Sequence, residues 1–293
     1  MLFDRLRDTD DDTVLYHYCT PDAFIEIVKN KTIRFSDINL LNDEQEGRYG
    51  YDVFIEAANS MLSGNKPDLI DGFDVEFVDL VDGAWHNMGF RLTSFLSCFS
   101  VDGDSLGQWR AYAADAEGFA IGFRASRIRA LPVQLLDVLY DRENQLSEMK
   151  IALAALYLEL KEAGLSPEEF GTKVNLIAAS SAAFKNTAWH EEKEVRAQHV
   201  VDVTIQEDCM FLNDAGGTTD EGDVGGQSIQ FHSRRGTLTP FIDMPFVVTD
   251  NVQPIAEVVL GPKCKNAAGN VLLALGNYGF KNVAIKKAGA AYR

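Results

Sequence analysis

Cysteine is scarce in this chain, and its few residues lie far apart. They are Cys19, Cys98, Cys209 and Cys264, and no two of them form a C-x-x-C pair. Neither a zinc site built on paired cysteines nor a disulfide framework is therefore expected. We expect reduced thiols and a cytoplasmic protein.

Positive charge and long apolar runs are also in short supply. The chain has 27 Lys and Arg residues against 44 Asp and Glu residues, which gives a formal net charge of -17. Such a surface does not attract nucleic-acid phosphates or anionic lipids over long range. The first residues are rich in Asp and Arg, with no apolar signal region, and no stretch reaches the length of a membrane span. We therefore expect no membrane partner.

Several catalytic fingerprints are absent as well. The sequence has no G-x-S-x-G nucleophile elbow, no P-loop and no glycine-rich dinucleotide fingerprint. This argues against serine-nucleophile catalysis. If NAD binds to this chain, it does so without a Rossmann fold.

The patterns that are present predict an α+β protein with many short strands. At 293 residues and 46% hydrophobic composition, the chain is long enough for one large domain or two small ones with a real core. We expect a single domain over residues 1–293. Thr20 and Pro21 predict the start of a helix after a first strand, and Ser166 and Glu169 predict a capping box. Two long helices predict a helical insert over about residues 144–187. The Gly- and Asp-rich stretch over about 213–226 predicts a mobile loop.

An acidic segment near residue 190 is the most informative part of the sequence. It runs Trp189-His190-Glu191-Glu192-Lys193-Glu194-Val195-Arg196. If it forms a strand, Glu192 and Glu194 project to the same side. Paired carboxylates can hold substrate hydroxyls and stabilise a cationic transition state. The same pattern of alternating charge is typical of a solvent-exposed surface strand. Arg196 could also pair with Glu194, which would occupy the proposed catalytic carboxylate.

Further motifs follow one another along nearly the whole chain. They are Leu15-Tyr16-His17-Tyr18, Ile33-Arg34-Phe35-Ser36, Leu41-Asn42-Asp43, Ser97-Cys98-Phe99-Ser100, Trp109-Arg110-Ala111-Tyr112-Ala113, Gly118-Phe119-Ala120-Ile121-Gly122-Phe123, Trp189 with Glu192-Lys193-Glu194-Val195-Arg196, and Glu257-Val258-Val259-Leu260-Gly261-Pro262. In this order the chain resembles the bacterial domain-of-unknown-function 2971 family.

The same order is remotely similar to the mono-ADP-ribosyltransferase superfamily, including its poly-ADP-ribose polymerase branch. These enzymes carry a histidine in a first strand, a Ser or Tyr region in a middle strand and helix, and a Glu in a later strand. Here these places are filled by His17 with Thr20, Ser97 or Ser100 with Tyr112, and Glu192 and Glu194. The resemblance implies a split antiparallel sheet of ADP-ribosyltransferase type with a helical insert.

It also implies an NAD-dependent mono-ADP-ribosyltransferase. NAD would be the substrate, no metal is expected, and the acceptor could be a protein, a nucleic acid or a small molecule. By analogy with other bacterial transferases, a role in toxin action or phage defence follows. Cleavage of the nicotinamide–ribose bond passes through an oxocarbenium-like state, which a carboxylate stabilises. Glu194 or Glu192 takes this catalytic role, and we expect Glu194→Gln to abolish turnover and leave the fold intact.

The remaining candidates would bind NAD. His17 would bond ribose hydroxyls, Tyr18 or Tyr112 would stack on the nicotinamide ring, and Arg34 would meet the pyrophosphate. Ser97, Ser100 and Trp109 complete the expected cofactor-binding set. Each has a structural alternative: His17 as a core histidine bonded to a backbone carbonyl, the aromatic residues as core or pocket wall, and the serines as caps or packing residues.

Two other functions remain open from the sequence. Glu191-Glu192-Lys193 contains the Glu-x-Lys of metal-dependent nucleases, for which Asp137 or Asp115 could supply a further carboxylate. The chain could also be a noncatalytic nucleotide- or protein-binding module. Dependence on a metal would distinguish the nuclease, and binding without turnover would distinguish the module.

Overall fold

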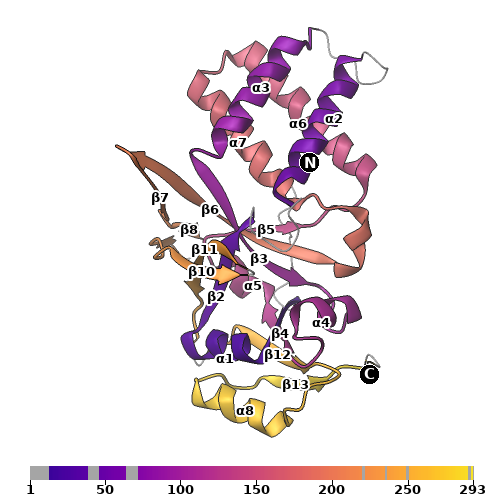
Figure 1. Ribbon diagram of the computed structural model, residues 1–293, viewed down its shortest axis with the longest axis vertical. Helices are drawn as coiled ribbons and strands as arrows, with labels where there is room; N and C mark the ends of the chain where they lie inside the picture. The colour runs from indigo at the N-terminus through magenta and orange to yellow at the C-terminus, as the bar shows by residue number, and fades with distance from the viewer. Residues whose placement is uncertain are drawn as a thin grey trace.

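A mixed α+β architecture with one large sheet is the main feature of the computed structural model (Figure 1). The model describes residues 13–38, 46–63, 72–219, 222–234, 236–248, 251–289 and 292. The Leu41-Asn42-Asp43 motif lies outside these residues. No helix in the described ranges has both the length and the apolar character needed to cross a bilayer.

The large sheet is mainly antiparallel, and in the described ranges it contains 11 strands. Its main path runs β10-β11-β2-β3-β1-β4-β12-β13, and β6 pairs with β3, β5 and β7. Only the β12–β13 pair is parallel in these ranges. The strands are β1 (Val14–Cys19), β2 (Thr32–Asp37), β3 (Leu92–Ser100), β4 (Phe119–Arg124), β5 (Gln134–Asp137), β6 (Glu194–Gln206), β7 (Cys209–Asn213), β10 (Gln230–Arg234), β11 (Thr237–Pro245), β12 (Ile255–Leu260) and β13 (Ala284–Lys287).

Four of the described helices form a bundle at one end of the large sheet, and shorter helices pack around the rest of the sheet (Figure 1). The bundle contains α2 (Glu46–Leu62), α3 (Val75–Met88), α6 (Arg142–Ala163) and α7 (Pro167–Ser180). The other helices are α1 (Pro21–Asn30), α4 (Leu106–Tyr112), α5 (Ala125–Arg129) and α8 (Ala268–Asn277), with short 3-10 turns η2 (Ser181–Ala183) and η3 (Thr187–Glu192).

Local sequence signals set several helix ends as predicted. The Thr20 hydroxyl accepts a hydrogen bond from the Ala23 backbone N–H, with Pro21 at the first helical position. Ser166 and Glu169 form the expected capping box of α7. Gly164 ends α6 in the left-handed conformation, with φ 64°.

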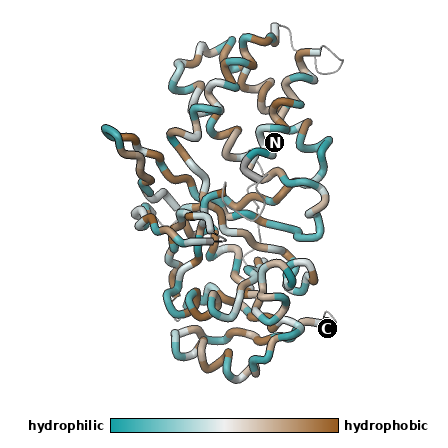
Figure 2. Tube along the Cα trace, viewed as in Figure 1, coloured by the Kyte–Doolittle hydropathy of each residue, from teal (hydrophilic) through white to brown (hydrophobic). Residues whose placement is uncertain are grey.

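The helical bundle is larger than the predicted insert. The predicted insert over about residues 144–187 covers α6 and α7, but α2 and α3 also belong to the bundle. Phe77 and Val81 of α3 enter the same buried cluster as Leu153 of α6 and Phe170 of α7. Their spacing along α3 is the ordinary signal of a buried helical stripe. Figure 2 shows hydrophobic and hydrophilic residues alternating along these helices.

The segment predicted as a mobile loop over 213–226 contains a small second sheet. Strands β8 (Gly217–Thr219) and β9 (Gly222–Val224) pair as an antiparallel hairpin. Asp214 closes its base, because its carboxylate accepts hydrogen bonds from the backbone N–H groups of Gly216 and Gln227. This stretch has too few apolar residues to show the alternation that predicts a strand. Backbone and side-chain hydrogen bonds hold the two strands together instead.

At Gly118 the backbone approaches the end of β1 closely. A Cβ atom at this position would lie 2.1 Å from the Cys19 carbonyl oxygen. We expect Gly118→Ala to lower the free energy of unfolding by about 1–3 kcal/mol, because the backbone at the end of β1 must shift. Urea denaturation measures this change. Gly171→Ala in α7 is the matched control, since nothing lies within 4 Å of the added atom, and an equal loss in both variants would contradict the explanation.

Candidate functional site

A pocket of about 960 Å³ opens where the central strands part. Strand β3 pairs with β2 at Phe95 and Leu96 and with β1 at Ser100. The residues between these pairings, Ser97 to Phe99, all line the pocket. The opening therefore follows from the topology, because β3 changes neighbour along its length.

Strand register places side chains from β2, β3 and β6 on one face of the sheet. Ser36 pairs with Leu96, and Leu96 pairs with Gln198. Since side chains alternate along a strand, Arg34, Cys98 and Glu194 share this face. All three line the pocket.

The acidic pair is held differently from the prediction. Glu192 ends the 3-10 turn η3, Lys193 is left-handed with φ 45°, and β6 begins only at Glu194. The predicted strand over this whole segment is therefore wrong at Glu192. The two carboxylates nevertheless converge, because both contact the ammonium group of Lys185. Its Nζ lies 2.5 Å from Glu192 Oε2 and 2.8 Å from Glu194 Oε2.

Arg196 pairs with Glu194, as the structural alternative in the sequence predicted. Arg196 Nε lies 2.9 Å from Glu194 Oε1, and the Arg196 side chain is 0% exposed. Burial by itself would raise the pKa of Glu194, but Arg196 and Lys185 lower that pKa to about 2. Glu194 is therefore ionised at neutral pH and pairs with two buried cations.

Glu192 lies in a different electrostatic environment. Burial raises the pKa of Glu192, and the ion pair with Lys185 offsets this only in part. Its Oε1 accepts a hydrogen bond from the Tyr112 hydroxyl at 3.1 Å. Its side chain is 11% exposed, against 4% for Glu194. Glu192 is thus the more accessible and more easily protonated member of the pair.

Lys185 was missed in the sequence. It follows η2 in an apolar stretch, Ala182-Ala183-Phe184, with no motif around it. The backbone fixes its position, because the Lys185 N–H donates to the Leu139 carbonyl and its own carbonyl accepts from Gln145 Nε2. In the sequence, a lysine directly after an apolar run is the one sign that its side chain is buried. Its charge is balanced by the two carboxylates.

His17 reaches the pocket from β1, and it lies beside Phe99 on the sheet face opposite to that of Cys98 and Glu194. Its Nδ1 lies 3.0 Å from the Cys98 carbonyl oxygen. A carbonyl can only accept, so Nδ1 carries the proton. Burial lowers the pKa of His17, which favours the neutral ring. Nε2 then presents an acceptor, so the predicted carbonyl bond and a binding role are compatible.

Three other predicted site residues, Tyr112, Tyr18 and Ser97, line the pocket, but they differ in exposure and contacts. Tyr112 lines the pocket and contacts Glu192. Tyr18 and Ser97 also line it, but Tyr18 is largely buried, with its ring edge-to-face on Trp109 and its hydroxyl donating to the Asp102 carbonyl. Stacking on nicotinamide is therefore more accessible to Tyr112 than to Tyr18.

Trp109 and Ser100 do not reach the pocket surface, which corrects their predicted role. Trp109 is 0% exposed, lies in a separate apolar cluster and donates its indole N–H to Asp104. Ser100 is also fully buried, and its hydroxyl donates to the Glu192 carbonyl at 2.7 Å. Ser100 thus fixes η3 on β3. Ser100 shares the sheet face of Cys98 and Glu194, but η3 covers it there, while Trp109 packs into its own apolar cluster.

Arg34 lines the pocket but is already paired. Its Nε and Nη2 donate to the two oxygens of Asp243 at 2.9 and 3.0 Å. Among the remaining lining residues, Gln108, Arg110 and Trp189 were not predicted as site residues. Trp189 is 43% exposed at the start of the acidic segment, and the Lys185 Nζ lies 5.4 Å from its ring.

Two residues of the nuclease alternative, Lys193 and Asp115, form ion pairs with other side chains. Glu191 is exposed, and Lys193 forms an ion pair with Asp102 at 3.1 Å. Asp115 instead pairs with Lys263 at 2.6 Å. Within the described part of the chain, no group of three or more His, Cys, Asp or Glu side chains is arranged to hold a metal ion.

Comparison with known proteins supports one part of the sequence interpretation. The model of the family described as "Protein of unknown function (DUF2971)" matches residues 108–197. This range is narrower than the expected match along nearly the whole chain. It contains α4 from Gln108 onward, Lys185 and the acidic pair, so the matched segment supplies one wall of the pocket. No curated protein and no solved structure matches the chain.

Proposed function

We propose that this protein binds NAD in the central pocket and transfers its ADP-ribosyl group to an acceptor. The observation that supports this most strongly is that Glu192, Tyr112 and His17 all line one pocket between parting strands, with the Tyr112 hydroxyl on Glu192. Its volume of about 960 Å³ lies in the range of small-molecule and cofactor sites. The three residues supply a carboxylate, an aromatic ring and a neutral imidazole.

The chemistry of the bond determines what the carboxylate does. The C–N bond between nicotinamide and ribose breaks, and its electron pair leaves on nicotinamide. Positive charge develops on the ribose, where a nearby carboxylate stabilises it. An acceptor nucleophile then forms a new bond to the same ribose carbon, and its proton passes to a base.

Glu192 is the better candidate for both tasks. Glu194 uses both oxygens on Arg196 and Lys185, and its low pKa makes it a weak base. Glu192 has the raised pKa and the greater exposure. When neighbouring carboxyl groups differ in this way, the group with the higher pKa is the natural acid or base. We therefore assign catalysis to Glu192 and positioning to Glu194.

One observation favours the runner-up, a noncatalytic nucleotide-binding module. Both carboxylates form ion pairs with Lys185, so they have a structural role that requires no substrate. In that case NAD would bind and remain intact.

Nicotinamide release from NAD tests the proposal. We expect the purified protein to release nicotinamide at a rate that EDTA does not change, and free NAD to raise its melting temperature. A thermal shift without release would support the binding module. If NAD causes no thermal shift and no nicotinamide is released, the proposed function is contradicted. Release that stops with EDTA would indicate a metal-dependent enzyme instead.

A further inference from the structure

Arg34, at one wall of the pocket, lies flat on the buried ring of Phe241. The Arg34 guanidinium carbon lies 3.7 Å from the centroid of the Phe241 ring. Phe241 is 5% exposed beneath it, and the Arg34 side chain is 45% exposed. The buried ring therefore supports one face of the guanidinium, while the arginine side chain lines the pocket.

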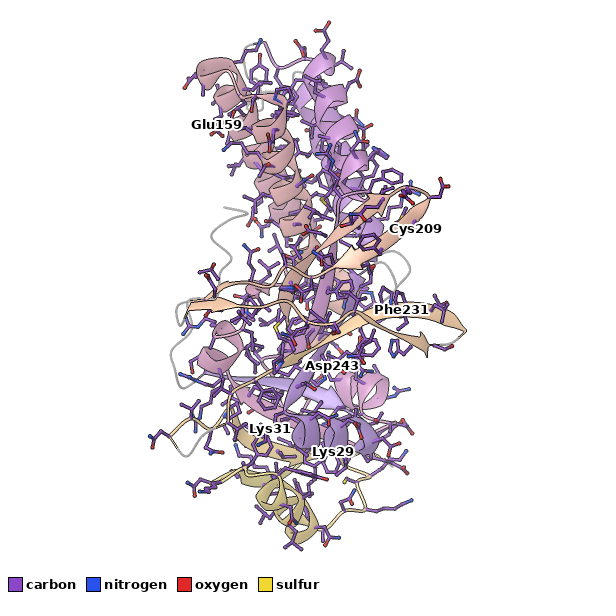
Figure 3. All side chains as sticks on the ribbon, turned by 90° about the vertical axis from the view of Figure 1, so that its left-hand side faces the viewer. Lys29, Lys31, Glu159, Cys209, Phe231 and Asp243 are labelled. Carbon is purple, nitrogen blue, oxygen red and sulfur yellow. The ribbon has the colours of Figure 1, made fainter. Side chains whose placement is uncertain are left out.

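Asp243 fixes the plane of this guanidinium. The paired hydrogen bonds of 2.9 and 3.0 Å are the two-pronged geometry that a planar guanidinium and a carboxylate favour. Register explains why the residues meet, since Asp243 on β11 pairs with Arg34 on β2 and Phe241 pairs with Ser36. Asp243 lies on its strand near the middle of the molecule (Figure 3).

The same carboxylate makes a phosphate an unsuitable ligand here. Asp243 neutralises the Arg34 charge and occupies its Nε and Nη2 donors. A phosphate approaching Arg34 would also meet the negative charge of Asp243. The predicted role of Arg34 with the pyrophosphate is therefore not favoured. The property that remains available is a rigid π surface, on which a base can stack.

The wall lies at a suitable place for the far end of a dinucleotide. Arg34 and Glu194 share one sheet face but belong to β2 and β6, with β3 between these strands. Two strand spacings would separate them laterally by about 10 Å, and the parting of β2 from β3 beyond Leu96 makes the distance larger. A ligand whose ribose lies against Glu192 can therefore extend along the sheet toward Arg34.

We propose that Arg34, supported by Phe241 and Asp243, is the platform on which the adenine base of the ligand stacks. This inference rests on the proposed function for the identity of the whole ligand. The platform itself requires only a planar base joined to ribose and phosphate. ADP carries that base, and nicotinamide mononucleotide lacks adenine, so the two compounds separate this subsite from the rest of the pocket.

The test uses Arg34→Lys in the full chain, with calorimetric titration of ADP and of nicotinamide mononucleotide. Lysine keeps the charge and the pairing with Asp243 but removes the plane. We expect the ADP dissociation constant to rise about tenfold and that of nicotinamide mononucleotide to stay unchanged. Arg48→Lys is the matched control, since Arg48 pairs with Asp52 on the surface of α2. A melting curve of each variant reports its fold.

The outcomes separate the platform from the proposed reaction. Unchanged ADP binding in Arg34→Lys, or no ADP binding by the wild-type protein, overturns the platform. An equal loss for both nucleotides also overturns it and assigns Arg34 to phosphate. If ADP binding weakens as expected but the wild-type protein releases no nicotinamide from NAD, the platform stands and the proposed transferase fails. If nicotinamide is released with an unchanged KM in Arg34→Lys, the transferase stands and the platform fails.

Discussion

Glu192→Gln is expected to reduce nicotinamide release from NAD by about a hundredfold or more. The substitution keeps the shape of the side chain and removes the charge that stabilises the developing cation. Lys185 retains its contact with Glu194 at 2.8 Å, so we expect the fold to persist. The loss should appear in kcat and leave NAD binding within a few fold, because the lost interaction strengthens only in the transition state.

The neighbouring Glu191→Gln provides a matched control for this variant. Glu191 carries the same charge one residue earlier but is exposed. Full activity in Glu191→Gln and loss in Glu192→Gln would assign the effect to position rather than to net charge. Wild-type turnover in Glu192→Gln would contradict the catalytic role proposed for this residue.

Glu194→Gln is expected to lower the free energy of unfolding by about 3–5 kcal/mol. This differs from the sequence-based expectation of an intact fold. The Arg196 side chain is 0% exposed and pairs with Glu194 at 2.9 Å, so the variant leaves a buried cation without its closest counter-charge. Urea denaturation measures the change. Activity lost in Glu194→Gln therefore reports stability as well as chemistry.

A surface ion pair supplies the comparison for Glu194. Glu56 pairs with Arg142 at 2.6 Å, but both side chains are about as exposed as ordinary surface residues, at 53% and 35%. Glu56→Gln should change the stability by no more than about 1 kcal/mol. The double variant Glu194→Gln/Arg196→Met should recover part of the loss, because it removes the buried charge together with its partner. Equal stability of Glu194→Gln and the wild-type protein would contradict this account.

Local sequence rules predicted much of the fold. The start of α1 at Thr20 and Pro21 and the capping box of α7 follow from hydrogen bonds within a few residues, which a single sequence contains. The α+β class followed from alternating strand and helix patterns. The sequence could not show that α2 and α3 join α6 and α7 in one bundle, because this packing joins segments far apart in the chain.

The candidate site was predicted less completely for the same reason. The sequence brought forward Glu192, Glu194, His17 and Tyr112, and all four line one pocket. It could not predict Lys185, whose position depends on a backbone hydrogen bond to Leu139. It also could not distinguish the two carboxylates, since their difference arises from Arg196 and from burial. Lys193 has a left-handed conformation that interrupts the strand, and the sequence has no glycine there to indicate such a turn.

A crystal structure of the Glu192→Gln protein with NAD tests the central claim most directly. The variant should bind NAD without consuming it. We expect the nicotinamide ribose beside Gln at position 192, a ribose hydroxyl on Nε2 of His17, and the diphosphate extending along the sheet. NAD bound at another surface, or a pocket that remains without NAD at saturating concentration, would contradict the proposed function.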